Sequence, residues 1–297
     1  MTSPISAASR GTDAPRPAPG RSGPKAPNAL AKVLRWIREH TLAAVTVVVF
    51  VFLLAPNAII LWMSFNQPVG KFNYTWNAFS LDAWKHPCAN NEMCHSLSLS
   101  VQIGLVTTAV STALGTMIAF AMVRYRFRAR SSVNSLLFLP MAAPEVVMGA
   151  TLTALFFNTV GPGSLGFWTI TVAHIMFCLS YVVVTVKARL AGMDPTLERA
   201  AQDLYATPTQ TFMKVTLPLV APGIAAAALL AFALSVDDYI VTVFTAGNLE
   251  TFPMYIWGSV QRAYPAQIDV IGSMMLLLTM AVIAISQVLN RVRNVRR

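Results

Sequence analysis

Long apolar runs alternate with short polar segments along most of this 297-residue chain. A helix needs about 20 mostly apolar residues to cross a bilayer. Six runs meet that length: residues 41–64, 96–123, 133–157, 167–186, 218–245 and 269–290. The first two contain no formally charged residue. The pattern predicts an all-α polytopic membrane protein with six transmembrane helices and with both termini on one side of the membrane.

The basic residues gather in alternate segments between these runs. Of the 22 Lys and Arg residues, 19 lie in the amino-terminal tail, the second and fourth connecting loops, and the carboxyl terminus. Such loops stay in the cytoplasm by the positive-inside rule. We therefore predict a multi-pass inner-membrane protein with cytoplasmic termini and a cytoplasmic loop over 187–217. The predicted parts are a disordered basic tail (1–40), a membrane domain (41–290) and a basic cytoplasmic tail (291–297).

Composition excludes several other classes of protein. Hydrophobic residues make up 55% of the chain and charged residues only 11%, as in membrane proteins surrounded by lipid. The net charge of +10 lies beside apolar runs, without the aromatic-interleaved basic face of a nucleic-acid binder. The sequence contains no HExxH, nucleophile elbow or Gly-rich phosphate loop, so we expect no enzyme, no catalytic residue, no metal site and no cofactor in this chain.

The polar loop between the fourth and fifth runs carries two helix-start signals. Asp194 can cap a helix that begins at Pro195, because proline lacks an N–H that would be unpaired there. Thr207 followed by Pro208 starts a second helix, and the glutamine three residues after Thr207 completes a capping box. Tyr205 and the next residue must then form the turn. The loop is predicted to be a helix–turn–helix.

The loop over 194–218 resembles the coupling loop, or EAA loop, of permease subunits of ATP-binding-cassette (ABC) importers. That loop reads Glu-Ala-Ala, three residues, Gly, and then a hydrophobic run that ends in Leu-Pro. Here Arg199 replaces the Glu, with Glu198 beside it, and Tyr205 replaces the Gly, where a left-handed turn costs an ordinary residue about 1–2 kcal/mol. An ordinary amphipathic loop is the alternative. The resemblance assigns ATPase coupling to Glu198, Arg199, Ala200, Ala201, Asp203, Leu204, Tyr205, Ala206, Phe212, Leu217 and Pro218.

Three carboxylates lie well inside predicted spans, away from their ends: Glu145, Asp237 and Asp238. An ionisable residue in the bilayer core costs at least about 2.5–3.5 kcal/mol, and it usually faces a bundle interior or an aqueous path. On a helix, Asp238 shares a polar stripe with Ser235 and Thr242. We expect all three acids in a substrate pathway and Asp238 foremost among them. The alternative is that they are structural and bonded to backbone or hydroxyl groups.

The stretch from Ser235 to Tyr239 resembles the Ser-x-Asp-Asp segment of spermidine/putrescine importer permeases, as do Pro140–Gly149 and Pro253–Ile268. This resemblance covers roughly residues 60–290 and implies one of two membrane subunits of an alternating-access pore. It also implies a second homologous permease, an extracytoplasmic solute-binding protein and a dimer of ABC ATPase subunits that binds ATP and Mg. We therefore expect a polyamine importer permease. A permease for iron, a phosphonate or an opine is an alternative, as is a stand-alone secondary transporter.

The cysteines and one histidine have simpler expected roles. Cys88 and Cys94 lie in the predicted extracytoplasmic segment 65–95, where a local disulfide is the leading interpretation. A metal site with the flanking histidines and a pair of free thiols are the alternatives. Cys178 is expected to be a small core residue, and His174 a hydrogen-bonded packing residue.

Overall fold

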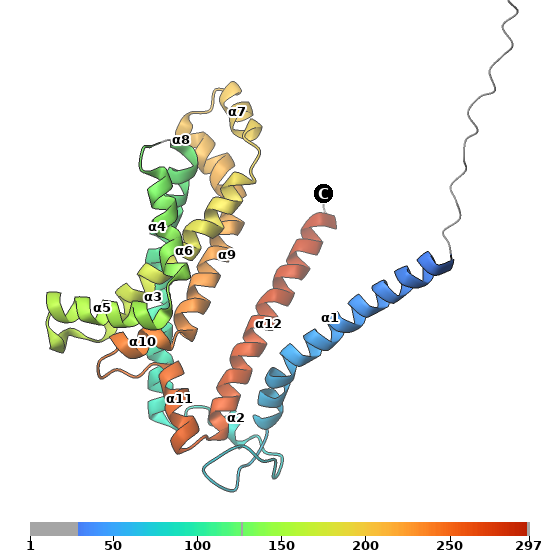
Figure 1. Cartoon of the computed structure of the whole chain (residues 1–297), viewed down its shortest axis with the longest axis vertical. Coiled ribbons are helices and arrows are strands. Elements are labelled where there is room, and N and C mark those ends of the chain that lie inside the picture. Colours follow the sequence, from blue (N-terminus) through green and yellow to red (C-terminus); the bar gives the residue numbers. More distant parts are fainter. Residues whose placement is uncertain (1–28, 126, 296–297) are drawn as a thin grey trace, which may run out of the picture. The chain divides into compact units, whose positions relative to one another are not determined.

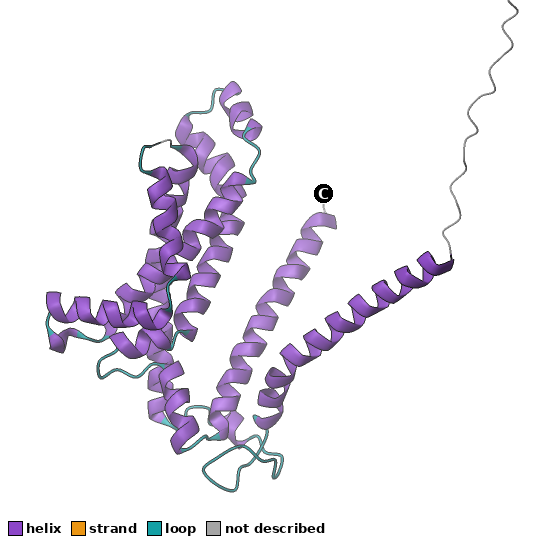
Figure 2. Ribbon diagram, in the orientation of Figure 1, coloured by secondary structure: helices purple, strands orange, loops and turns teal. Residues whose placement is uncertain are grey.

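The computed structural model describes residues 29–125 and 127–295 (Figure 1). Across these ranges the chain forms helices joined by turns and loops, and no strand (Figure 2). The prediction of an all-α protein is therefore confirmed. Contacts divide the chain into two units, residues 1–56 and 57–297, and the boundary falls inside the first helix.

The first helix, α1 (Ala29–Met63), begins within the segment that we expected to be a disordered tail. That expectation is wrong for residues 29–40. Apolar residues at positions 30, 33, 34 and 37 have the spacing of one face of a helix. The helix therefore continues from the apolar run toward the amino terminus as an amphipathic segment. Residues 1–28 of the predicted tail lie outside the described residues. From His40 to Pro56 every side chain is exposed.

Three long helices form the bundle of the second unit. They are α3 (Asn91–Arg124), α6 (Phe167–Ala191) and α9 (Leu217–Asp237), and they pack on one another. Two of them match the predicted spans 96–123 and 167–186 closely. Both helices extend a few residues beyond the apolar runs, and the added residues include polar ones.

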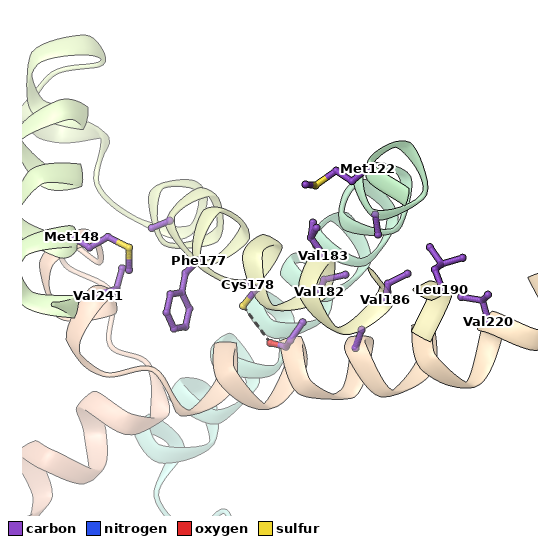
Figure 3. Packing of buried hydrophobic residues seen from close by; sticks show 14 of the residues in the cluster. Met122, Met148, Phe177, Cys178, Val182, Val183, Val186, Leu190, Val220 and Val241 are labelled. Atoms are coloured by element: carbon purple, nitrogen blue, oxygen red, sulfur yellow. Dashed lines mark hydrogen bonds between the residues drawn. The ribbon is translucent and has the colours of Figure 1, made fainter. Parts of the chain in front are cut away.

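The centre of the bundle is packed by residues from all three helices. Figure 3 shows Val182 and Val186 of α6 between Met122 of α3 and Val220 of α9, and all four are buried. A Cβ added to Gly115 of α3 would lie 2.6 Å from Val182, so this glycine permits close approach of α3 and α6. Such small residues favour tight packing in membranes, where van der Waals contact replaces the hydrophobic effect as the driving force.

The predicted third span, 133–157, is divided into α4 (Arg130–Ala142) and α5 (Glu145–Thr159), which meet at 105°. Our expectation of one continuous helix here is wrong. Ala143 precedes Pro144 and has extended backbone (φ −71°, ψ 138°), because a residue before proline is disfavoured in helical conformation. Figure 1 shows α5 projecting away from the bundle.

The predicted fifth span, 218–245, is also interrupted. The helix α9 ends at Asp237, Asp238 is extended (ψ 121°), and the short helix α10 (Ile240–Thr245) follows. There is no proline or glycine at this break. Aspartate favours positions where its carboxylate accepts a backbone N–H at the start of a helix, and the contacts described below show that it does so here.

Four described helices are long and apolar enough to cross a membrane, and the bent α4–α5 pair would make a fifth. In α12 (Ala266–Val295), the apolar stretch found among the described residues is Ala266–Ala281, which is shorter than a full span. A count of six spans therefore stays a prediction. Outside the loop between α6 and α9, the remaining elements are α2 (Asp82–Lys85), the 3₁₀ turn η1 (Pro162–Ser164) and α11 (Phe252–Arg262).

Candidate functional site

The loop after α6 contains two short helices, α7 (Thr196–Asp203) and α8 (Pro208–Thr211), which confirms the predicted helix–turn–helix. Figure 1 shows them at one end of the bundle. A π-helical turn, η2 (Phe212–Thr216), joins α8 to α9. Pro218 explains the wider turn, because it has no N–H and its ring would clash with the carbonyl four residues earlier.

Both helix starts are capped by side chains. The backbone N–H of Thr196 donates to Oδ1 of Asp194 at 2.9 Å. This bond and one from the Thr196 hydroxyl hold the pKa of Asp194 below its ordinary value. At α8 the hydroxyl of Thr207 accepts from the Gln210 N–H at 3.3 Å, and the Gln210 amide oxygen accepts from the Thr207 N–H at 3.0 Å. The predicted capping box is present.

The turn between the two helices requires left-handed backbone at Tyr205. Its φ is 60°, and among the described residues it is the only non-glycine with positive φ. The family pattern has glycine at this position, so the chain keeps the turn geometry and places an unfavourable residue in it. The side chain of Tyr205 is 96% exposed and that of Leu204 is 82% exposed. The loop therefore presents two apolar side chains to its surroundings.

A charged cluster ties α7 to the bundle. Glu198 forms an ion pair with Arg124 at the end of α3, and it also accepts a hydrogen bond from Thr216 before α9. The guanidinium of Arg124 lies 5.8 Å from the ring centre of Phe120, which packs edge-on against Phe212 at 5.3 Å. Movement of α7 would thus be transmitted to α3 and α9. We call Glu198, Arg124 and Thr216 the loop anchor.

The other coupling residues predicted from the sequence divide by exposure. Arg199, at the family's glutamate position, is exposed, whereas Glu198 points to the bundle, so the neighbouring glutamate makes the internal contacts. Exposed members are Arg199, Ala200, Asp203, Leu204, Tyr205 and Pro218, and the half-buried members are Ala201, Ala206, Phe212 and Leu217.

A second polar cluster lies at the break between α9 and α10. The ring of His174 in α6 approaches three residues: Nδ1 is 2.8 Å from Ser235 Oγ, and Nε2 is 3.0 Å from Thr242 Oγ1 and 3.2 Å from Asp238 Oδ2. A carboxylate only accepts, so Nε2 carries the proton and donates. Asp238 Oδ2 also accepts the Thr242 N–H at 2.8 Å, which caps α10. We call these four residues the break cluster.

The three acids predicted to line a substrate pathway differ in exposure. The side chains of His174 and Asp238 are only 3% and 7% exposed. Asp237 and Glu145 are exposed, and neither carboxylate has a hydrogen bond or ion pair to another described residue. The polar stripe of Ser235, Asp238 and Thr242 is real, but it faces His174 of the same chain. Asp238 is therefore buried and hydrogen-bonded within the chain, and its place in a substrate pathway stays a prediction.

Sequence reasoning missed a third polar group near the start of α12. Asp269 is 3% exposed, accepts from Asn73 Nδ2 at 2.7 Å and accepts from the Tyr264 hydroxyl at 2.8 Å. Burial, and then the neighbouring Asp269, raise the pKa of Tyr264, so its hydroxyl keeps the proton that it donates. Asn73 also donates to the carbonyl of Met63 at 2.9 Å. The position of Asp269 as the first residue of the predicted sixth span was the available signal.

The structure joins Cys88 and Cys94 by a disulfide, with their Cα atoms 5.6 Å apart. Cys178 is buried in the bundle, and its Sγ donates to the carbonyl of Ala231 at 3.5 Å (Figure 3). Within the described part of the chain, no three His, Cys, Asp or Glu side chains gather where they could hold a metal ion.

Known proteins with similar sequences are polyamine permeases by name. The spermidine/putrescine permease protein PotC of Haemophilus influenzae is 34% identical over 83% of this chain and 95% of its own length. PotC of Escherichia coli is 32% identical over 82% and 91%, and the E. coli putrescine permease protein PotI is 33% identical over 76% and 82%.

Solved structures show the same fold at low sequence identity. A bacterial ABC transporter involved in alginate import matches with a TM-score of 0.56 at 17% identity, over 86% of this chain and 97% of the other. The same transporter type in complex with an alginate-bound periplasmic protein gives a TM-score of 0.58 at 17% identity, over 88% and 94%. Residues 111–295 match the family described as the binding-protein-dependent transport system inner membrane component. This chain therefore belongs to that family of inner-membrane permease components.

Proposed function

We propose that this chain is one of two permease subunits of an ABC importer that carries polyamines such as spermidine or putrescine into the cytoplasm. The names of its relatives support this cargo. The observation that carries the proposal is Asp237, an exposed carboxylate at the end of an apolar helix of the chain. An acid at membrane depth faces protein or water rather than lipid. Asp237 must therefore be covered by a second permease subunit or line the path between the two.

A pair of aromatic rings, one of them two residues after Asp237, fits a cationic cargo. The rings of Tyr239 and Trp257 of α11 lie 5.6 Å apart, and Trp257 is 59% exposed. Ammonium groups are attracted to the faces of aromatic rings as well as to carboxylates. A polyamine has several ammonium groups, so separated carboxylates and rings can replace part of the hydration that it loses. Glu145, exposed at the start of α5, supplies a second carboxylate in this proposal.

The break cluster has a different role in the same mechanism. By capping α10 and bonding to His174, Asp238 ends α9 next to Asp237 and fixes where that carboxylate projects. Interrupted helices at membrane depth are a recurrent way to build a transport site. Asp238 is therefore a positioning residue, and Asp237 and Glu145 are the residues that we propose meet the cargo.

Coupling to ATP hydrolysis follows from the loop. We propose that the exposed Leu204 and Tyr205 contact an ABC ATPase dimer in the cytoplasm, which holds ATP and Mg. Closure of that dimer would move α7, and the loop anchor would pass the movement to α3 and α9 through Arg124 and Thr216. A rigid-body rocking of packed helices would then switch access to Asp237. An extracytoplasmic solute-binding protein would supply the cargo.

Uptake of labelled spermidine into proteoliposomes tests both the proposed cargo and the proposed role of Asp237. The vesicles contain this chain, its partner permease and the ATPase, with the binding protein outside. Asp237→Asn is expected to lower uptake about tenfold, the factor that corresponds to roughly 1.4 kcal/mol of lost interaction. Glu250→Gln changes an exposed acid that we assign no role and is expected to leave uptake unchanged.

Three outcomes would contradict the proposal. Equal uptake by Asp237→Asn in an assembled complex would remove Asp237 from the path. Failure of unlabelled spermidine and putrescine to compete, while iron, a phosphonate or an opine competes, would assign another cargo. Transport by this chain reconstituted without an ATPase would indicate a secondary transporter.

A further inference from the structure

A basic cavity of about 520 Å³ lies at the end of the bundle that carries the coupling loop. Its walls are formed by Met122 of α3, by Phe127 and Arg128, by the first turns of α4 and by Lys187 near the end of α6. Three cationic residues line it: Arg128, Arg130 and Lys187. Among the residues that the structure describes, none of the three has an ion pair with a carboxylate. The cavity thus concentrates positive charge that no carboxylate in the described part of the chain neutralises.

Polar groups around the cavity are arranged to receive an anion. Lys187 Nζ donates to Asn134 Oδ1 at 2.6 Å, and this hydrogen bond holds the ammonium group at the cavity wall. The ammonium has two further N–H donors. The first turn of α4 contains no acidic residue, and no side chain caps it. The positive end of the helix dipole at such a start favours a phosphate. Ser131 in this turn also lines the cavity.

An apolar surface continues from the cavity along α4. This helix has no buried residue, and Leu136 and Leu139 are 64% and 62% exposed. Both residues line an adjoining shallow cavity together with Ser131. A ligand with a phosphate head and apolar chains would match the two parts in order. Free phosphate or a nucleotide would use only the first part.

We propose that this cavity binds the headgroup of an anionic phospholipid, with the acyl chains along Leu136 and Leu139. The assignment rests on the proposed cytoplasmic position of the coupling loop, since basic pockets on that side of a membrane meet the anionic leaflet surface. Met122, which lines the cavity, lies two residues before Arg124 of the loop anchor in α3. A bound lipid would therefore brace the α3–α4 connection against which the coupling loop moves.

Native mass spectrometry of the purified, delipidated full chain tests this proposal. The probe is an equimolar mixture of phosphatidylglycerol and phosphatidylcholine with identical acyl chains. Phosphatidylglycerol is expected to bind in preference. The double variant Arg128→Gln/Arg130→Gln is expected to weaken its binding about 25-fold, at about fivefold for each charge removed near a membrane surface. Lys187→Gln alone is expected to weaken it about fivefold.

The control is a second double variant, Lys214→Gln/Arg262→Gln, which removes two exposed cations outside the cavity and is expected to keep the preference. Thermal unfolding of each variant shows whether it is folded. Undiminished phosphatidylglycerol binding by Arg128→Gln/Arg130→Gln, or equal binding of both lipids by the unchanged chain, would overturn the proposal. Glycerol phosphate that binds as tightly as the lipid would assign the cavity to a soluble phosphate instead. Because no transport is measured, failure here leaves the cargo proposal standing.

Discussion

The loop anchor and the break cluster each join three parts of the chain around one acidic residue, but they differ in exposure. In the loop anchor, the side chains of Arg124 and Glu198 are 39% and 18% exposed. In the break cluster, those of His174 and Asp238 are 3% and 7% exposed. Water competes for the first pair and not for the second. The loop anchor is therefore suited to a contact that moves, and the break cluster to one that stays.

Neighbouring charged residues in the chain also differ in the contacts that they make. Glu198 and Arg199 are adjacent on α7, yet only Glu198 contacts the bundle. Asp237 and Asp238 are adjacent at the end of α9, yet only Asp238 is bonded within the described chain. In each pair the outward residue is free for a partner subunit or cargo. Each pair also provides a matched control for experiments on its neighbour.

The largest expected effect is that of Asp238→Leu on the stability of the chain. The substitution leaves the His174 N–H and the Thr242 backbone N–H without their buried acceptor. Removal of one member of a buried charged contact costs about 3–5 kcal/mol. The free energy of unfolding of the purified chain, measured by denaturant titration in detergent micelles, should fall by about this amount.

Asp237→Leu is the matched control for that measurement. Asp237 is exposed in the isolated chain, so its replacement should change the free energy of unfolding by no more than about 0.5 kcal/mol. Equal losses for Asp237→Leu and Asp238→Leu would mean that the break cluster does not distinguish the two acids. Asp238→Asn keeps an acceptor for Thr242 and should fall between the two variants.

An intermediate effect is expected at the loop anchor. Glu198→Gln removes the charge that pairs with Arg124, and a partly exposed ion pair contributes up to about 1 kcal/mol. Hydrogen exchange of the α7 amides should accelerate by roughly fivefold, because local opening becomes easier by that free energy. Arg199→Gln, one residue away and exposed, should leave exchange unchanged. Faster exchange in Arg199→Gln but not in Glu198→Gln would show that Arg199, and not Glu198, holds α7 to the bundle.

The smallest effect, and the only stabilising one, is expected for Tyr205→Gly. Glycine relieves the left-handed backbone, worth about 1–2 kcal/mol, but it also loses about 0.4–1 kcal/mol through the greater freedom of the unfolded chain. At the midpoints of the two ranges the net gain is about 0.8 kcal/mol, so the loop amides should exchange about fourfold more slowly. Less ATPase should also co-purify with this variant. We propose that the Tyr205 ring contacts the ATPase, and glycine removes that ring. Faster exchange would show that φ at Tyr205 is not a source of strain.

Local sequence was sufficient to predict the coupling loop. Its helix starts depend on Asp194 and Thr207, whose partners lie two and three residues away. A capping interaction forms within a single turn, so residue order alone determines it. Pro144 similarly contained the signal for the bend after α4, although we counted the run as one span.

The role of each acid could not be decided in that way. His174 and its partners Ser235 and Thr242 are separated by 61 and 68 positions, and only the packing of α6 against α9 brings them together. The amino-acid order by itself determined that acids occur at membrane depth and that a polar loop must fold into two capped helices. Tertiary structure alone decided which acid is buried, because burial depends on the neighbouring helix and not on the residue next in sequence.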